Sequence, residues 1–231
     1  MDLTNRNVSI WGDSIMKGIV FDDINGRYRV LETNCVNRFA EITGTPITNH
    51  ARFGMTVGKG YERIKRALEL SMPAEDEIVL LEYGGNDCDF VWAEVAANPH
   101  ATHLPRTPID QFGTILQSIV DLFRSFRITP ILMSLPPLDP RKYFAWLSRG
   151  LNQETLYRWL GDVHRIYRWQ EAYSNIVVDT AIRNDLRVIN VRKDFLVRDD
   201  CASMICTDGI HPNESGQESI LRSVLSYVSA V

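Results

Sequence analysis

Residues 8–14 read VSIWGDS, an apolar run that ends abruptly in a small, polar and flexible tripeptide. The run has the length and composition of a buried β-strand, so the tripeptide places a serine hydroxyl at the end of a predicted sheet. Open α/β sheets bind their ligands at the carboxyl ends of their strands. Because a serine hydroxyl is a weak nucleophile until a base removes its proton, Ser14 raises the question of which residues supply that base.

A base and a group to orient it lie near the other end of the chain, in residues 207–213, TDGIHPN. Asp208 precedes His211 by three residues, which brings its carboxylate within reach of the imidazole Nδ1. That contact would leave Nε2 free to take the Ser14 proton and would stabilise the imidazolium. The simpler interpretations are a helix N-cap for Ser14 and a plain turn for Asp208. A plain Asp-Gly turn, however, does not require a histidine at this spacing.

Two further blocks supply candidate donors for an oxyanion. Gly54 follows the second predicted strand, and Asn86 lies in the block GGND directly after an apolar run. A glycine lets the backbone approach a substrate oxygen closely, and an asparagine amide donates without charge. We expect these two residues and the Ser14 N–H to form an oxyanion hole, although each block alone also fits an ordinary loop or turn. Asp13 and Asp87 are expected to hold their turns by accepting backbone N–H groups.

In this order and spacing, the blocks resemble the SGNH (GDSL-type) hydrolase family, from Gly12 to His211. The resemblance implies a single domain over residues 1–231, with an α/β fold: a three-layer, flavodoxin-like α/β/α sandwich with a five-stranded parallel sheet and a central first strand. It also implies a serine carboxylic ester hydrolase that uses no cofactor and no metal. The family pattern falls on Ser14, Gly54, Asn86 and His211, with Asp208 as the third member of a catalytic triad.

The periodicity of the chain agrees with a parallel sheet, because strand patterns alternate with helix patterns. We expect strands near residues 8–12, 46–49, 77–82, 130–135 and 187–191. Helices are expected around residues 36–43, 61–72, 107–126, 166–180 and 213–228, with Thr107 as an N-cap. A polar loop is expected at 17–29, an irregular excursion at 89–106, an aromatic-rich excursion at 139–160, and a loop with a helical turn at 194–206.

Composition narrows the class of protein. The chain has 231 residues, of which 45% are hydrophobic and 23% charged, as in ordinary globular proteins. A net charge of −4 without a basic stripe argues against a nucleic-acid partner, and no apolar run is long enough to cross a bilayer. The early first strand leaves no room for a signal peptide, and the four cysteines fit free thiols better than a Cys201–Cys206 disulfide. We therefore expect a cytoplasmic protein with a small-molecule partner.

The resemblance implies that Ser14 attacks an ester carbonyl, His211 carries the proton, and water releases the acyl group. The expected cytoplasmic location favours short-chain acyl (acetyl) esters, such as acetylated carbohydrates. A lysophospholipase or thioesterase acting on lipids, acyl transfer to an alcohol, and a non-catalytic ligand-binding module on the same fold stay open as alternatives. The aromatic residues between Tyr143 and Trp159 fit sugar stacking, an acyl groove or the core of a small helical flap.

Overall fold

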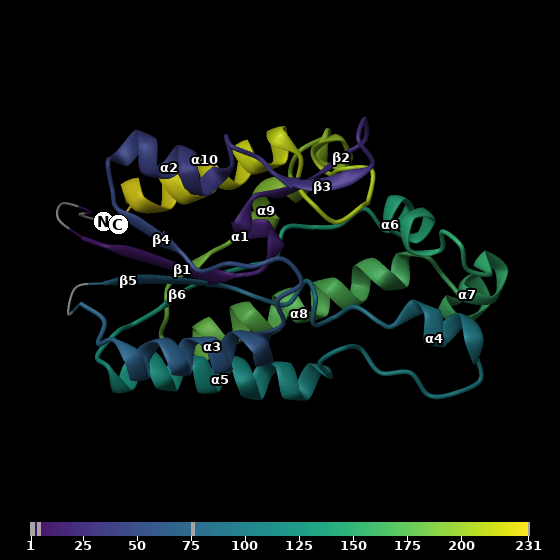
Figure 1. The fold of residues 1–231 in the computed structure, drawn as a ribbon, viewed down its shortest axis with the longest axis horizontal. Coiled ribbons are helices and arrows are strands. Elements are labelled where there is room, and N and C mark those ends of the chain that lie inside the picture. Colours follow the sequence, from purple (N-terminus) through teal and green to yellow (C-terminus); the bar gives the residue numbers. More distant parts are fainter. Residues whose placement is uncertain (1–2, 4–5, 75–76, 231) are drawn as a thin grey trace.

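In the computed structural model, a parallel β-sheet lies between two layers of helices (Figure 1). Residue 3 and residues 6–74 and 77–230 are described. Within them the sheet has five strands: β1 (Val8–Gly12), β4 (Ile47–Asn49), β5 (Ile78–Glu82), β6 (Ile131–Met133) and β7 (Val188–Ile189). Their order in space is β4-β1-β5-β6-β7. The predicted three-layer α/β/α fold is confirmed, but β5 rather than the first strand is central.

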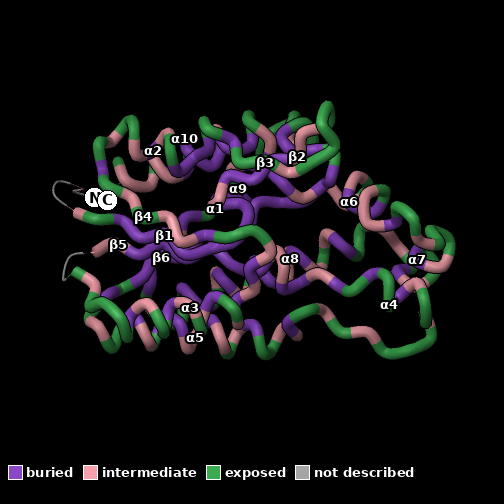
Figure 2. The backbone as a smooth tube through the Cα atoms, viewed as in Figure 1, coloured by how far each residue is buried: buried purple, intermediate pink, exposed green. Residues whose placement is uncertain are grey.

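Helices cover both faces of this sheet. One layer contains α2 (Cys35–Thr43), α9 (Val191–Leu196) and α10 (Glu214–Ala230). The other contains α3 (Val57–Leu70), α5 (Ile109–Ser125) and α8 (His164–Arg183). In β5, Leu80 packs with the first layer, whereas Val79 and Leu81 pack with the second. Because successive strand residues point to opposite faces, a strand covered on both sides is apolar along most of its length, and Figure 2 shows the inner strands β1 and β6 as buried.

The segment after Ser14 is more regular than predicted. Ser14 begins a short helix, α1 (Ser14–Lys17), and an antiparallel hairpin follows, made of β2 (Ile19–Asp22) and β3 (Arg27–Val30). The predicted polar loop at 17–29 is therefore wrong. The sequence did not predict this hairpin, because the residues of β3 are exposed or half-buried and form no apolar face. In β2, Val20 packs in a small cluster with Leu31 and Cys206.

Two excursions at the carboxyl end of the sheet contain helices. The region 89–106, predicted as irregular, includes α4 (Trp92–Ala97). The aromatic-rich region 139–160 consists mainly of α6 (Pro140–Leu147) and α7 (Gln153–Leu160). Their buried side chains form one apolar cluster with Phe90, Trp92 and Ile166. The aromatic residues are thus largely the core of a helical flap, which lies beyond the ends of the strands (Figure 1).

The start of α5 differs from the prediction. Thr107 was expected as the N-cap, but Pro108 occupies that position and provides no side-chain cap. The Thr107 hydroxyl instead donates to Asp87 Oδ1 at 2.6 Å, and its carbonyl accepts the Tyr173 hydroxyl at 2.5 Å. Thr107 therefore joins the loop after β5 to α8, a tertiary role that no local pattern could predict.

The region 194–206 holds the end of α9 and a 3₁₀ turn at Cys201–Met204, close to the prediction. All four cysteines lie in the described part and are free. Among residues 3, 6–74 and 77–230, no helix is both long and apolar enough to cross a membrane.

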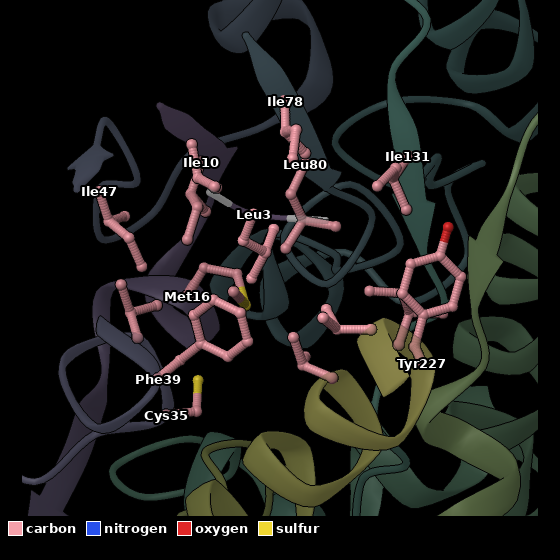
Figure 3. Close-up of a pocket in the computed structure, with 15 residues that line it drawn as sticks. Leu3, Ile10, Met16, Cys35, Phe39, Ile47, Ile78, Leu80, Ile131 and Tyr227 are labelled. Atoms are coloured by element: carbon pink, nitrogen blue, oxygen red, sulfur yellow. The ribbon is translucent and has the colours of Figure 1, made fainter. Parts of the chain in front are cut away.

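An apolar cavity of about 50 Å³ lies between the sheet and the layer that contains α2 and α10 (Figure 3). Its walls include Ile10 and Leu80 from the sheet, Phe39 from α2 and Tyr227 from α10. Its lining is almost entirely apolar, and it shares no lining residue with the cavity at Ser14. Void space of this kind leaves dispersion contacts unmade in the core.

Candidate active site

Ser14 lies at the carboxyl end of β1, where the strand turns sharply into α1. The Asp13 carboxylate accepts the Ile15 N–H at 2.9 Å and so caps this short helix, as expected for a residue that holds its turn. Gly12 lets β1 lie close to β5 at this point, because a Cβ there would lie 2.8 Å from the Glu82 carbonyl oxygen. The sequence GDS thus fixes the serine at the end of the strand.

Ser14, His211 and Asp208 form a continuous hydrogen-bonded line. Ser14 Oγ lies 2.9 Å from His211 Nε2, and His211 Nδ1 lies 2.5 Å from Asp208 Oδ2. Asp208 Oδ1 also accepts the backbone N–H groups of Ile210 and His211. Burial of Asp208 opposes its ionisation, but the bonds from His211 and the backbone outweigh it and hold its pKa below the usual value. The carboxylate is therefore charged and oriented toward the imidazole.

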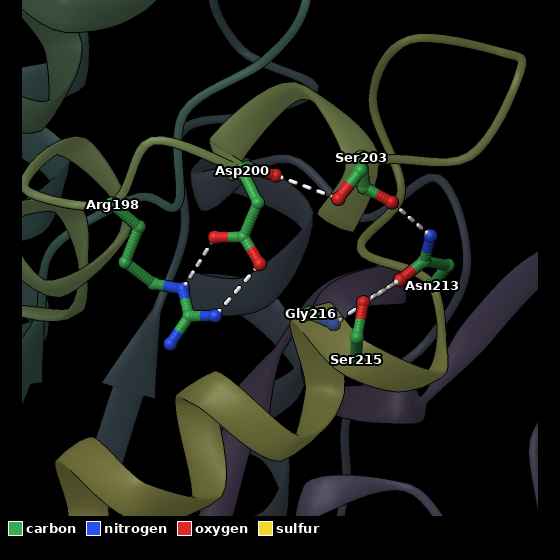
Figure 4. Close-up of polar contacts among 6 residues, drawn as sticks. All are labelled: Arg198, Asp200, Ser203, Asn213, Ser215 and Gly216. Carbon is green, nitrogen blue, oxygen red and sulfur yellow. Dashed lines mark hydrogen bonds and ion pairs between the residues drawn. The ribbon is translucent and has the colours of Figure 1, made fainter.

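The loop that carries Asp208 and His211 is held at its end by Asn213 (Figure 4). Asn213 Oδ1 accepts the Gly216 N–H at 3.2 Å, so it caps α10, and its Nδ2 donates to the Ser203 carbonyl at 2.7 Å. Nearby, Arg198 binds Asp200 through two bonds of 2.8 Å. The two bonds of Asn213 therefore tie the segment before the loop to the helix after it.

Gly209 fixes the other side of this loop, and sequence reasoning gave it no role. Its φ is +80°, and a Cβ there would lie 2.2 Å from the backbone nitrogen of Tyr143 in α6. Its carbonyl accepts the Asp139 N–H at 2.8 Å. The backbone of α6 therefore packs directly on the loop between Asp208 and His211, which only a glycine permits.

Of the predicted oxyanion donors, Asn86 is near the serine and Gly54 is less directly placed. Asn86 Nδ2 donates to Asp13 Oδ2 at 2.9 Å, which uses one of its two amide hydrogens. Within the described chain, the cavity at Ser14 is lined by Asn86 but not by Gly54, whose neighbour Phe53 lines it instead. The φ of +70° at Gly54 favours glycine, and no described atom lies within 4 Å of the place that a Cβ would occupy there.

Asp87 acts beyond its own turn, unlike the prediction. Its carboxylate accepts the Val57 N–H at 3.0 Å, at the start of α3, as well as the Thr107 hydroxyl. Burial raises the pKa of Asp87 to about 6, although these hydrogen bonds oppose the shift. Asp87 thereby connects the loop after β5 to two other segments and supports the neighbouring Asn86.

The cavity at Ser14 has a volume of about 110 Å³, and its walls combine aromatic, aliphatic and polar side chains. Two aromatic rings pack against the His211 imidazole. The ring centre of Tyr28, from β3, lies 5.2 Å from the imidazole centre. The ring centre of Phe53 lies 5.8 Å away, and its ring is nearly parallel to the imidazole. Phe53 is 52% exposed and forms the outer edge. Sequence reasoning missed Tyr28, because its proximity to His211 depends on the unpredicted hairpin.

The inner wall of the cavity contains a carboxyl group, Asp89. It accepts the Tyr143 hydroxyl at 2.6 Å and the Trp92 indole N–H at 2.8 Å, and it faces Arg106 at 3.7 Å. Burial raises the pKa of Asp89. Trp169 of α8 lines the same wall. In the described residues, His, Cys, Asp and Glu form no group of three or more suited to a metal ion.

Comparisons with known sequences agree along most of the chain. The model of the GDSL-like lipase/acylhydrolase family matches residues 10–218. The GDSL esterase/lipase WDL1 of Oryza sativa subsp. japonica is 26% identical over 179 residues, covering 74% of this chain and 61% of the relative. The GDSL esterase/lipase CPRD49 of Arabidopsis thaliana is 24% identical over 184 residues, covering 76% and 63%. The chain thus spans about three fifths of the length of these curated relatives.

Solved structures share the fold over nearly the whole chain. A lipase/acylhydrolase from Enterococcus faecalis has a TM-score of 0.66 and 16% identity, covering 97% of this chain and 96% of that one. A member of the lipolytic G-D-S-L family from Veillonella parvula has a TM-score of 0.68 and 14% identity, covering 98% and 100%. An acetylxylan esterase from Geobacillus stearothermophilus, solved as a catalytic mutant, has a TM-score of 0.63 and 15% identity, covering 96% and 93%.

Proposed function

This chain belongs to the GDSL-like lipase/acylhydrolase family, and from that membership and the geometry at Ser14 we propose that it is a serine carboxylic ester hydrolase. The observation that carries the proposal is the line from Ser14 Oγ to His211 Nε2 at 2.9 Å and from His211 Nδ1 to Asp208 at 2.5 Å. A nucleophile, a base and a group that orients the base are the parts that acyl transfer requires.

The reaction proceeds in two halves. His211 Nε2 takes the Ser14 proton while Oγ attacks the ester carbonyl, and the charge on the carbonyl oxygen is met by the Ser14 N–H and the second amide hydrogen of Asn86. Asp208 stabilises the imidazolium. The imidazolium then gives its proton to the departing alcohol, which leaves an acyl group on Ser14. Water, deprotonated by His211, attacks this acyl-enzyme, and the carboxylic acid departs as Ser14 regains its proton.

We further propose short-chain acyl esters of polar alcohols, such as acetylated carbohydrates, as the substrates. The cavity is small, at about 110 Å³, and its inner wall contains the carboxyl group of Asp89. A long alkyl chain against a carboxyl group would remove water from it without replacing its hydrogen bonds. The hydroxyl groups of a polar alcohol supply such bonds, and the rings of Trp92 and Trp169 offer apolar surface beside them.

Nitrophenyl esters of acetate, butyrate and octanoate test both levels of the proposal. We expect wild-type protein to hydrolyse the acetate fastest and Ser14→Ala to lose this activity. A wild-type preference for octanoate would contradict short-chain substrates and indicate lipid esters or thioesters instead. Equal rates for wild type and Ser14→Ala would remove the serine hydrolase proposal and favour a ligand-binding module. Product analysis with added alcohols distinguishes hydrolysis from acyl transfer.

A further inference from the structure

Two buried carboxyl groups lie side by side next to Ser14, at the ends of β1 and β5. Asp13 is 1% exposed and Glu82 is 0% exposed. The Asp13 N–H lies 3.4 Å from Glu82 Oε2, and the two carboxyl groups are within hydrogen-bonding reach of each other. Gly12 leaves the room for this arrangement, because a Cβ there would lie 3.2 Å from Glu82 Oε2. The proposed mechanism gives Glu82 no part.

Two carboxylates in contact in a buried site cannot both be charged, so the pair holds one proton. Asp13 receives hydrogen bonds from the Ile15 N–H and from Asn86 Nδ2, each at 2.9 Å, and such donors favour the charged form. From the described residues, Glu82 receives only the long contact from the Asp13 N–H. Its Oε1 is buried and has no hydrogen-bond partner in the described part of the chain. The charge therefore belongs on Asp13 and the proton on Glu82.

The surroundings of Glu82 reinforce this assignment. Burial, and then the nearby charge of Asp13, raises the pKa of Glu82 well above its usual value. Asp87 acts in the same direction, and the Cys35 thiol and the Tyr83 hydroxyl face the same region. None of these groups is a cation that would stabilise a charged Glu82. Burial also raises the pKa of Asp13, but its hydrogen bonds and the nearby imidazole oppose that shift.

We propose that Glu82 is a positioning residue that keeps the proton of this pair and donates it in a hydrogen bond to the charged Asp13, so that Asp13 fixes the Asn86 amide beside Ser14. This inference rests on the proposed function. A carboxylate only accepts hydrogen bonds, so a charged Asp13 orients the nitrogen of the Asn86 amide toward itself. The second hydrogen on that nitrogen is then presented to the oxyanion. A neutral Asp13 could itself donate, and the amide could turn to present its oxygen, which would repel the oxyanion.

Two substitutions distinguish the effect of the Glu82 proton from the effect of the side-chain volume. Glu82→Gln keeps a neutral donor of the same length, whereas Glu82→Met has a similar length and no donor. With nitrophenyl acetate, we expect Glu82→Gln to keep at least about a third of wild-type kcat. Glu82→Met should lose about tenfold or more in kcat with little change in KM, because an oxyanion donor acts mainly in the transition state. Circular dichroism and the thermal midpoint establish that each variant is folded.

A double variant tests whether Glu82 acts by positioning Asn86 or by supporting the whole site. Because Glu82 acts through Asn86, adding Glu82→Met to Asn86→Ala should lower kcat little beyond Asn86→Ala alone. Infrared spectroscopy at pH 8 tests the proton directly. At that pH, Asp87, with a pKa of about 6, is charged. Wild type minus Glu82→Gln should then show the carbonyl band of a protonated carboxyl group.

Any of three results would overturn the inference. The first is no such band in the difference spectrum, and the second is an equal kcat for Glu82→Gln and Glu82→Met. The third is a double variant whose fold-loss in kcat equals the product of the losses from Glu82→Met and Asn86→Ala. If Glu82→Met does not fold, the infrared band and the kcat of Glu82→Gln still decide. A wild-type protein without esterase activity would instead contradict the proposed function. In that case the infrared band alone decides where the proton lies.

Discussion

Asn86 is the side chain on which the proposed chemistry depends most after the serine and histidine. Its amide lies beside the cavity at Ser14 and is oriented by the 2.9 Å bond to Asp13. Loss of one oxyanion donor costs about 3 kcal/mol of transition-state stabilisation, or about a hundredfold in kcat.

We therefore expect Asn86→Ala to lower kcat on nitrophenyl acetate by about a hundredfold, and circular dichroism establishes that the variant is folded. The matched control is Asn98→Ala, at the end of α4, which should keep wild-type kcat. Wild-type turnover by Asn86→Ala would remove this amide from the mechanism.

At the scale of single residues, Ser14, Asp208 and His211 could be predicted because each lies in a short block with unusual local chemistry. The structure brings these three side chains together. Tyr28 and Asp89 could not be predicted in the same way. Their places in the cavity depend on how the hairpin and the helical flap fold over the strand ends, and no short-range pattern encodes that contact.

At the scale of elements, the backbone of α6 packs closely on the loop that contains Asp208 and His211. Gly209→Ala would place a Cβ 2.2 Å from the Tyr143 backbone nitrogen. Gly161 has a similar φ of +72°, but no described atom lies within 4 Å of its Cβ position. An alanine at either position would have to adopt a positive φ, but only the alanine at position 209 would also clash with α6.

We expect Gly161→Ala to cost about 1–2 kcal/mol in the free energy of unfolding, from the positive φ alone. Gly209→Ala should cost several times more and should also abolish activity, because the loop must move away from Ser14. Urea unfolding and kcat on nitrophenyl acetate measure both effects. Equal stability and activity for the two variants would mean that α6 does not hold the loop.

The prediction of elements succeeded where a segment is apolar on the side that faces the sheet. It failed for β2 and β3, which form a hairpin away from the main sheet, and for α4 and the helices of the flap. In those segments the periodicity is short or interrupted, and their structure depends on the aromatic cluster around Phe90 and Trp92. Tertiary packing, rather than local propensity, decides such segments.

At the scale of the whole molecule, the apolar cavity beneath α2 and α10 should lower stability. Val36 of α2 lines this cavity and is buried. Val36→Ile adds one methylene to the void, which should raise the free energy of unfolding by about 1 kcal/mol and the thermal midpoint by about 2–4 °C. The matched control is Val197→Ile, at a residue that is 72% exposed, and its midpoint should not change. A lower midpoint for Val36→Ile would mean that the space cannot accept the group.

Stability should also depend on pH through the buried Asp87, whose pKa is raised from 3.8 to about 6. The folded state then binds this proton more tightly than the unfolded state, so stability falls as pH rises through that window. Urea unfolding at about pH 4 and about pH 7 measures the effect for wild type and Asp87→Asn. The free energy of unfolding of wild type relative to the variant should fall by about 2 kcal/mol between these two conditions. A difference independent of pH would contradict the raised pKa.

The overall architecture was the most predictable level, because alternating strand and helix patterns allow few arrangements. The numbers of strands and layers came from the family resemblance rather than from periodicity, and the central first strand that the resemblance implied is wrong. The central position of β5 follows from β6 and β7 both adding on its far side, which no single segment reveals.

Covalent labelling of Ser14 tests the central proposal most directly. A phosphonylating reagent with a nitrophenyl leaving group, followed by intact-mass and peptide mass spectrometry, should give one adduct, on Ser14. Ser14→Ala should give none, and His211→Ala should react far more slowly because the base is missing. An unlabelled wild-type protein, or an adduct on another residue with Ser14 unmodified, would contradict Ser14 as the nucleophile.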